Sequence, residues 1–165
     1  MCRVSAEMSV KIWLTEAELA YALMAATARI NSTKGYSYEN AHLDPEELLR
    51  LCALGAAAEL AAAKWLNVPN FVLSIDTYKD EPDIWPNWEV KHTEYANGHL
   101  IIKDSDRDTD RAVLITGVNP FTIVGWLPVD FCKDDLYLKA TRQTAISYWV
   151  PQAELVKVYD SVSQA

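Results

Sequence analysis

The segment "ALGAAAELAAAKWL", residues 53–66, restricts the fold more than any other, because it consists almost entirely of alanine and leucine. It is the second half of a predicted helix that runs to about Leu66, with Asp44 as its N-cap, Pro45 at the first helical position and Glu47 completing a capping box. Such small side chains let a helix approach a flat neighbour closely. We therefore expect this helix to pack against a sheet.

The rest of the chain changes from helical to strand periodicity. "LTEAELAYALMAATARIN" predicts an earlier helix, in which Thr15 caps the N-terminus and Glu18 reaches back to complete a capping box. After "NVPN", short runs rich in β-branched and aromatic residues alternate with turn residues, which indicates strands. The predicted strands are "FVLSID", "WEVKH", "HLIIK", "RAVLITG" and "TIVGWL". Pro151 is expected to open a short last helix that contains Glu154 and Leu155.

Length and composition indicate one globular domain. The 165 residues are 50% hydrophobic, with only five glycines and seven prolines, so the chain can bury a sizeable core and is not disordered. We predict an α+β fold (an α/β arrangement of a central mixed sheet flanked by helices) over residues 1–165. Its parts are a helical segment at about 1–66, a sheet region at about 70–128 and a closing segment at 129–165.

The cysteines and the charge limit the location and the partners of the protein. Three widely spaced cysteines form neither a disulfide framework nor a zinc site, and no apolar run is long enough for a signal peptide or a membrane span. We therefore expect a cytoplasmic protein without a membrane partner. A net charge of −8 repels nucleic acid unless basic residues gather on one face or acidic residues hold a metal. Candidate phosphate contacts are Lys34, Lys79, Lys103, Lys139 and Arg142.

The stretch "DIWPNWEVKH", residues 83–92, contains the residues that best suit chemistry. On a strand, Glu89 and Lys91 share one face and Val90 faces the core, as in any half-buried strand. If the stretch folds as an irregular hairpin, the carboxylate of Asp83 approaches that of Glu89. Two close carboxylates repel each other unless a cation lies between them, and hard oxygen ligands suit Mg²⁺ or Mn²⁺. Lys91 would then lie beside a metal-bound phosphate and the attacking water.

These residues resemble the PD-(D/E)XK nuclease superfamily, with "EPDIWPNWEVK" in the place of its signature and a helix containing "GAAAELAAAKWL" before it. "DRAVLITG", "IVGWLP" and "YWVPQAEL" are similar to the later strands and closing segment of small phage and bacterial members. The resemblance covers about residues 50–156 and leaves out the first helix. It implies a restriction-endonuclease-like fold.

The resemblance also implies a site. Its catalytic residues would be Glu59, Asp83, Glu89 and Lys91. Its metal, Mg²⁺ or Mn²⁺, would be held by Asp83, Glu89 and the backbone carbonyl of Val90, with Glu59 acting through a water.

Two of these assignments have alternatives. The interval between Asp83 and Glu89 is short and is bracketed by prolines, so Asp76 or Asp80 could be the first acidic ligand instead. A glutamate such as Glu59 could also be solvent-exposed, or buried against a partner. That partner could be a nearby lysine such as Lys64 or Lys91.

The function implied is a metal-dependent nuclease, phage-encoded and located in the host cytoplasm, that hydrolyses DNA phosphodiester bonds. A homo-oligomer is expected, since cutting both strands with one site per chain needs two copies. The alternatives are an inactive nuclease-fold protein that binds and inhibits a host protein as a charge mimic, and an RNase with the same metal chemistry.

Other conspicuous residues favour structural interpretations. "KDSDRDTDR", residues 103–111, has alternating aspartates like a calcium loop, but it lacks the glycine and glutamate of an EF-hand and is interpreted as a solvated turn. Trp85 and Trp88 flank the site and could stack on a base, although packing is the commoner role of tryptophan. His92 should face away from Lys91 and be structural.

Overall fold

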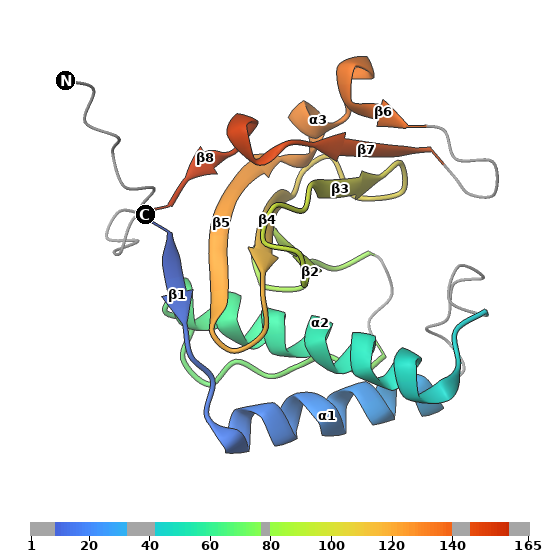
Figure 1. Ribbon diagram of the computed structural model, residues 1–165, viewed down its shortest axis with the longest axis vertical. Coiled ribbons are helices and arrows are strands. Elements are labelled where there is room, and N and C mark those ends of the chain that lie inside the picture. Colours follow the sequence, from blue (N-terminus) through green and yellow to red (C-terminus); the bar gives the residue numbers. More distant parts are fainter. Residues whose placement is uncertain (1–8, 33–41, 77–79, 140–145, 159–165) are drawn as a thin grey trace.

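The computed structural model describes residues 9–32, 42–76, 80–139 and 146–158, and these form a mixed α+β fold in layers (Figure 1). Helix α2 lies between helix α1 and a five-stranded sheet, and a three-stranded sheet lies on the other side of the large one. The predicted fold class is therefore confirmed at the level of a mixed sheet flanked by helices. None of the described helices has the length and apolar content needed to cross a membrane.

The two long helices begin where the sequence predicts. Helix α1 spans Glu16–Asn31, and Thr15 and Glu18 form the reciprocal capping box. Helix α2 spans Pro45–Trp65, and the side chain of its N-cap, Asp44, accepts a hydrogen bond from the amide of the third helical residue. The predicted capping box of α2 is only half formed, because the Glu47 carboxylate accepts hydrogen bonds from Arg50.

The large sheet has the strand order β1-β5-β4-β2, with β8 also paired to β5. Strands β2 and β4 are parallel, and the other pairs are antiparallel. Strand β2 is an edge strand that pairs with β4 alone in this order. The backbone N–H and C=O groups on its other side can therefore bind side chains. The strands are β1 (Val10–Ile12), β2 (Trp88–Thr93), β4 (Arg111–Thr116), β5 (Phe121–Pro128) and β8 (Val156–Lys157).

The small sheet has the order β3-β7-β6, and both of its pairs are antiparallel. Its strands are β3 (Leu100–Lys103), β6 (Leu138–Lys139) and β7 (Ser147–Val150). Short helical turns join the strands: α3 (Val129–Cys132), η2 (Asp135–Tyr137) and η3 (Gln152–Glu154). Gly125 of β5 is required where the chain crosses over it, because a Cβ there would lie 2.7 Å from the Val156 carbonyl oxygen.

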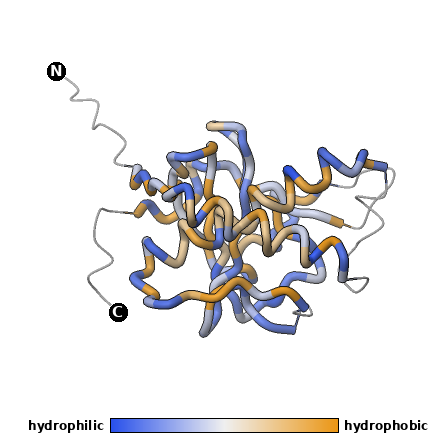
Figure 2. Tube along the Cα trace, turned by 90° about the horizontal axis from the view of Figure 1, so that it is seen from below, coloured by the Kyte–Doolittle hydropathy of each residue, from blue (hydrophilic) through white to orange (hydrophobic). Residues whose placement is uncertain are grey.

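Strand β4 is buried on both faces and separates two hydrophobic cores. Val113 and Ile115 belong to the core beneath α2, and Ala112 and Leu114 belong to the core beneath the small sheet. Figure 2 shows hydrophobic segments running through the middle of the described chain. In α2, every residue from 56 to 63 is buried, so the predicted close packing of the alanine-rich segment is confirmed.

Three sequence predictions are wrong at the level of elements. Residues 71–76 form no strand, because α1 side chains bind their backbone: Tyr21 Oη accepts from the Leu73 amide at 2.9 Å, and Arg29 Nε donates to the Ser74 carbonyl at 2.7 Å. The segment predicted as helical contains strand β1. The last predicted helix is a single 3₁₀ turn that ends before Leu155.

Candidate functional site

The hairpin that precedes β2 brings Asp83 to the open edge of the large sheet. Ile84 and Trp88 exchange two backbone hydrogen bonds, at 3.0 and 2.9 Å, so the chain turns tightly between them and forms an irregular hairpin. The Val90 amide donates to Oδ2 of Asp83 at 2.7 Å. The N–H and C=O of one strand residue point to the same side, so the Val90 carbonyl also faces this edge.

Glu89 and Lys91 lie on one face of β2, and Val90 packs on the other side against the core beneath α2. The Lys91 ammonium lies 3.0 Å from Glu89 Oε1 and 2.9 Å from Asp106 Oδ2. All three side chains are largely buried, with 21%, 22% and 12% of their side-chain surface exposed. One ammonium group is therefore shared by two carboxylates.

The carboxyl groups of Asp83 and Glu89 are close enough to influence each other strongly. Burial raises the pKa of Asp83 to about 7, and the charge of Glu59 adds to this shift, while the Val90 amide and Lys91 oppose it. Burial also raises the pKa of Glu89 to about 7, with the charge of Asp83 acting in the same direction. Near neutral pH this edge therefore holds either extra protons or a surplus of negative charge, which a cation would relieve.

Lys91 remains protonated in this setting. Burial alone would lower the pKa of Lys91, but the charges of Glu89 and Asp106 outweigh burial and raise it above its ordinary value. A protonated lysine beside two carboxylates is a fixed positive charge. It can orient or stabilise an anion such as a phosphate oxygen.

Glu59 adjoins this group from α2 but has a different partner. Arg29 of α1 donates to both of its carboxylate oxygens, at 3.0 and 2.9 Å. Burial raises the pKa of Glu59, and the arginine opposes that shift. The partner is neither Lys64, which pairs with Glu18, nor Lys91. The first helix, which the family resemblance leaves out, thus contributes directly to this region.

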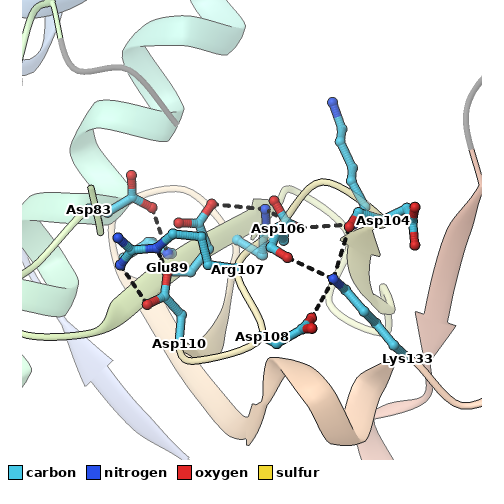
Figure 3. Close-up of polar contacts among 11 residues, drawn as sticks. Asp83, Glu89, Asp104, Asp106, Arg107, Asp108, Asp110 and Lys133 are labelled. Atoms are coloured by element: carbon cyan, nitrogen blue, oxygen red, sulfur yellow. Dashed lines mark hydrogen bonds and ion pairs between the residues drawn. The ribbon is translucent and has the colours of Figure 1, made fainter. Parts of the chain in front are cut away.

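The loop "KDSDRDTDR" is more than a solvated turn. It joins β3 to β4 as predicted, but Asp110 is only 3% exposed and is paired with Arg107, and Asp106 binds Lys91. Lys133 fills the centre of the loop, where its ammonium donates to the carbonyls of residues 104 and 106 and to the Asp108 carboxylate (Figure 3). A lysine thus binds two backbone carbonyls and one aspartate carboxylate of the segment that resembles a calcium loop.

The other candidates separate into structural and exposed groups. Trp88 packs edge-on against Trp65 and Trp126, in line with the favoured packing role, whereas Trp85 is 83% exposed at the hairpin turn. The structural role predicted for His92 is supported by its ring nitrogen, 2.8 Å from the Gly117 carbonyl on the helix side of β2. Of the predicted phosphate contacts, Lys139 lies over the Trp149 ring. Lys34, Lys79 and Arg142 lie outside the described residues.

The alternative first ligands have other contacts. The Asp76 carboxylate accepts a hydrogen bond from Ser32 at 2.6 Å, and the backbone carbonyl of Asp80 accepts one from Arg107. Neither side chain is seen to contact Val90, as that of Asp83 does. The geometry therefore favours Asp83 over Asp76 and Asp80 as the partner of Glu89.

In the described part of the chain, no three side chains of histidine, cysteine, aspartate or glutamate form a set that could hold a metal ion. The edge of β2 instead offers the carboxylates of Asp83 and Glu89 and the carbonyl of Val90. Oxygen donors of this kind fit magnesium or manganese, which keep several water ligands. Both oxygens of Glu59 are engaged by Arg29, so Glu59 would act only through a water.

Two members of the region, Arg29 and Asp106, were not among the predicted site residues. Arg29 gave no signal, because nothing in the sequence of the first helix shows which residue it meets. The alternation of aspartates in residues 103–111 did mark Asp106, but its proximity to Lys91 depends on the tertiary fold. No protein-family model, curated protein or solved structure matches the chain.

Proposed function

We propose that this protein is a metal-dependent nuclease that hydrolyses phosphodiester bonds in DNA, with its site at the edge of β2. The observation that carries the proposal is the shortage of positive charge there. Asp83 and Glu89 interact electrostatically, each has a pKa raised to about 7, and the Lys91 ammonium in contact with Glu89 is shared with Asp106. A cation bound by both carboxylates would relieve their repulsion, and carboxyl groups with strongly raised pKa values are common at functional sites.

The residues at this edge fit the parts that phosphodiester hydrolysis requires. Asp83, Glu89 and the Val90 carbonyl would hold Mg²⁺ or Mn²⁺, with Glu59 behind them. When bound, the metal would supply the charge that polarises the phosphate and lowers the pKa of a bound water. Lys91 carries a permanent charge on the same face, where it would orient the attacking water and stabilise the negative charge that develops on the phosphate. The Val90 amide fixes the orientation of Asp83.

Cleavage assays test this proposal directly. The purified chain is incubated with supercoiled plasmid, linear duplex, single-stranded DNA and RNA, in the presence of Mg²⁺, Mn²⁺ or EDTA. We expect metal-dependent cleavage of DNA that falls by about a thousandfold or more in Glu89→Gln and in Lys91→Met, as for loss of a metal ligand or a charge-stabilising group. Preferential cleavage of RNA would identify an RNase instead.

Glu94→Gln is the matched control. Glu94 follows the same strand but lies at the surface, where it pairs with Arg50. Its loss should leave cleavage unchanged. If the wild type cuts no substrate with either metal, or if Glu89→Gln cuts as fast as the wild type, the nuclease proposal is wrong.

A second candidate function, a binding protein that acts as a charge mimic, is favoured by the state of the basic side chains. The net charge is −8, and several described cations are neutralised by carboxylates. These are Arg29, Arg50, Lys64, Lys91, Arg107 and Lys133. Such a surface suits a partner that itself binds nucleic acid. A chain that cuts nothing but blocks cleavage by a DNA-binding enzyme would support this alternative.

A further inference from the structure

Lys91 holds its ammonium against Glu89, a proposed direct ligand of the metal. Its ammonium lies 3.0 Å from Glu89 and 2.9 Å from Asp106, and all three side chains are mostly buried. Ion pairs at such distances are stronger where water is largely excluded than at the surface. A metal ion that binds Glu89 must therefore compete with this ammonium for the same carboxylate.

Asp106 is held in place by its own loop, independently of Lys91. Its Oδ2 accepts a hydrogen bond from the Lys103 amide at 2.8 Å, and its own amide donates to the Lys103 carbonyl at 3.0 Å. Its carbonyl oxygen accepts from the Lys133 ammonium at 2.7 Å. The Asp106 carboxylate would therefore stay in position if the Lys91 ammonium moved away from Glu89.

We propose that Asp106 is a positioning residue that retains the Lys91 ammonium when a divalent cation takes Glu89, so that Lys91 and Asp106 together set the metal affinity of the site. This inference rests on the proposed function, because it requires a metal at Glu89. Without Asp106, the ammonium would bind Glu89 alone, and the metal would have to displace it completely. With Asp106, the ammonium keeps an anionic partner beside the reacting phosphate.

The opposing interpretation is that Asp106 is simply another metal ligand. The two interpretations differ in a double-mutant cycle of Asp106 and Lys91, because a positioning residue acts only through its lysine. Calorimetric titration with Mn²⁺ alone, at one fixed pH and without nucleic acid, measures affinity separately from cleavage. The proteins compared are the wild type, Asp106→Asn, Lys91→Met and the double variant.

We expect Lys91→Met to bind Mn²⁺ about tenfold more tightly than the wild type, because a competing charge is removed. Asp106→Asn should bind about tenfold more weakly, because the ammonium then occupies Glu89 alone. In the Lys91→Met background, the same Asp106 substitution should change the affinity by less than about threefold, since its effect depends on the lysine. Asp106→Glu, which keeps the charge, should restore most of the affinity.

Asp108→Asn is the matched control, because it removes one negative charge from the same loop at a side chain that is 68% exposed and pairs with Lys133. It should leave Mn²⁺ affinity unchanged. Lys91→Gln serves as a second neutral variant, since a glutamine can still donate hydrogen bonds to both carboxylates. If Lys91→Met does not fold, Lys91→Gln takes its place in the double-mutant cycle.

The outcomes separate this inference from the nuclease proposal. If Asp106→Asn weakens Mn²⁺ binding equally in the wild-type and Lys91→Met backgrounds, Asp106 is a metal ligand. If it weakens Mn²⁺ binding in neither background, Asp106 has no role in metal affinity. Both results overturn the positioning role but keep the metal site. Mn²⁺ binding that is seen only after removal of Lys91 supports competition between the metal and the Lys91 ammonium for Glu89. The absence of Mn²⁺ binding in all four proteins overturns this inference and the metal site together.

Discussion

Glu59 and Glu89 are two largely buried glutamates that both interact electrostatically with Asp83, and they differ in how their charge is balanced. Glu59 faces an arginine that donates to both of its oxygens, so its charge is neutralised by a bidentate partner. Glu89 shares one ammonium with Asp106 and also faces Asp83. Burial alone therefore does not identify a functional carboxylate. The number of cations that accompany it separates a structural pair from a site that can accept another ion.

The largest effect should come from breaking the balanced pair. Glu59→Gln leaves Arg29 buried without its counter-charge, and we expect the free energy of unfolding in urea to fall by about 3–5 kcal/mol. The double variant Glu59→Leu/Arg29→Met should recover much of this loss, because both charges are removed together.

The same double variant sharpens the comparison. Its Mn²⁺ affinity should remain within about threefold of the wild type if the pair is structural, because one anion and one cation are removed together and the net charge near the site is unchanged. A much weaker Mn²⁺ affinity would show that Glu59 contributes to metal binding. If Glu59→Gln lowers the free energy of unfolding by no more than Glu47→Gln at the surface, Glu59 and Arg29 do not form a stabilising buried pair.

The next effect is the pH dependence of stability at the unbalanced site. The folded pKa values of Asp83 and Glu89 are both about 7, above their ordinary values of 3.8 and 4.5, so the folded state binds more protons between these limits. In EDTA, this pair should therefore stabilise the fold at low pH and lose that contribution as pH rises through 7. The loss should be on the order of 3 kcal/mol.

Urea unfolding across this pH range, in the wild type and in Glu89→Gln, measures the contribution. The variant should show a flatter dependence, and Mn²⁺ should restore stability to the wild type above pH 7, since a cation replaces the protons. Equal slopes in both proteins would mean that the two carboxylates do not interact as described.

A smaller effect is expected from Lys133, which organises the loop that carries Asp106. Lys133→Met removes three hydrogen bonds to oxygens of residues 104, 106 and 108. We expect a loss of about 1–3 kcal/mol and faster hydrogen exchange at the amides of residues 104–110. Unchanged exchange would show that the loop keeps its shape without the lysine, and that Asp106 is held by other contacts.

The smallest effect should follow Asp108→Asn in the same loop. Its carboxylate pairs with Lys133 but is 68% exposed, so solvent screens the interaction. The free energy of unfolding should change by no more than about 0.5 kcal/mol. A loss as large as that of Lys133→Met would show that Lys133 stabilises the loop mainly through the Asp108 carboxylate and not through the backbone carbonyls.

Much of the secondary structure follows from local sequence. The caps of α1 and α2 and strands β2, β3, β4 and β5 were predicted, because capping residues and apolar periodicity act over a few neighbouring positions. Residues 71–76 have a strand-like composition, yet their backbone is bound by Tyr21 and Arg29 of a distant helix. Strand β1 was missed because a three-residue run has too little pattern to be distinguished from a loop.

The candidate site divides in the same way. The sequence alone determined that Glu89 and Lys91 share one face of a strand and that Asp83 precedes them, because alternation along a strand is local geometry. Only the tertiary structure decided that Arg29 neutralises Glu59 and that Asp106 takes part of the Lys91 charge. Charges act through space, so the distance between two of them depends on how helices, hairpins and loops pack, which one-dimensional spacing does not encode.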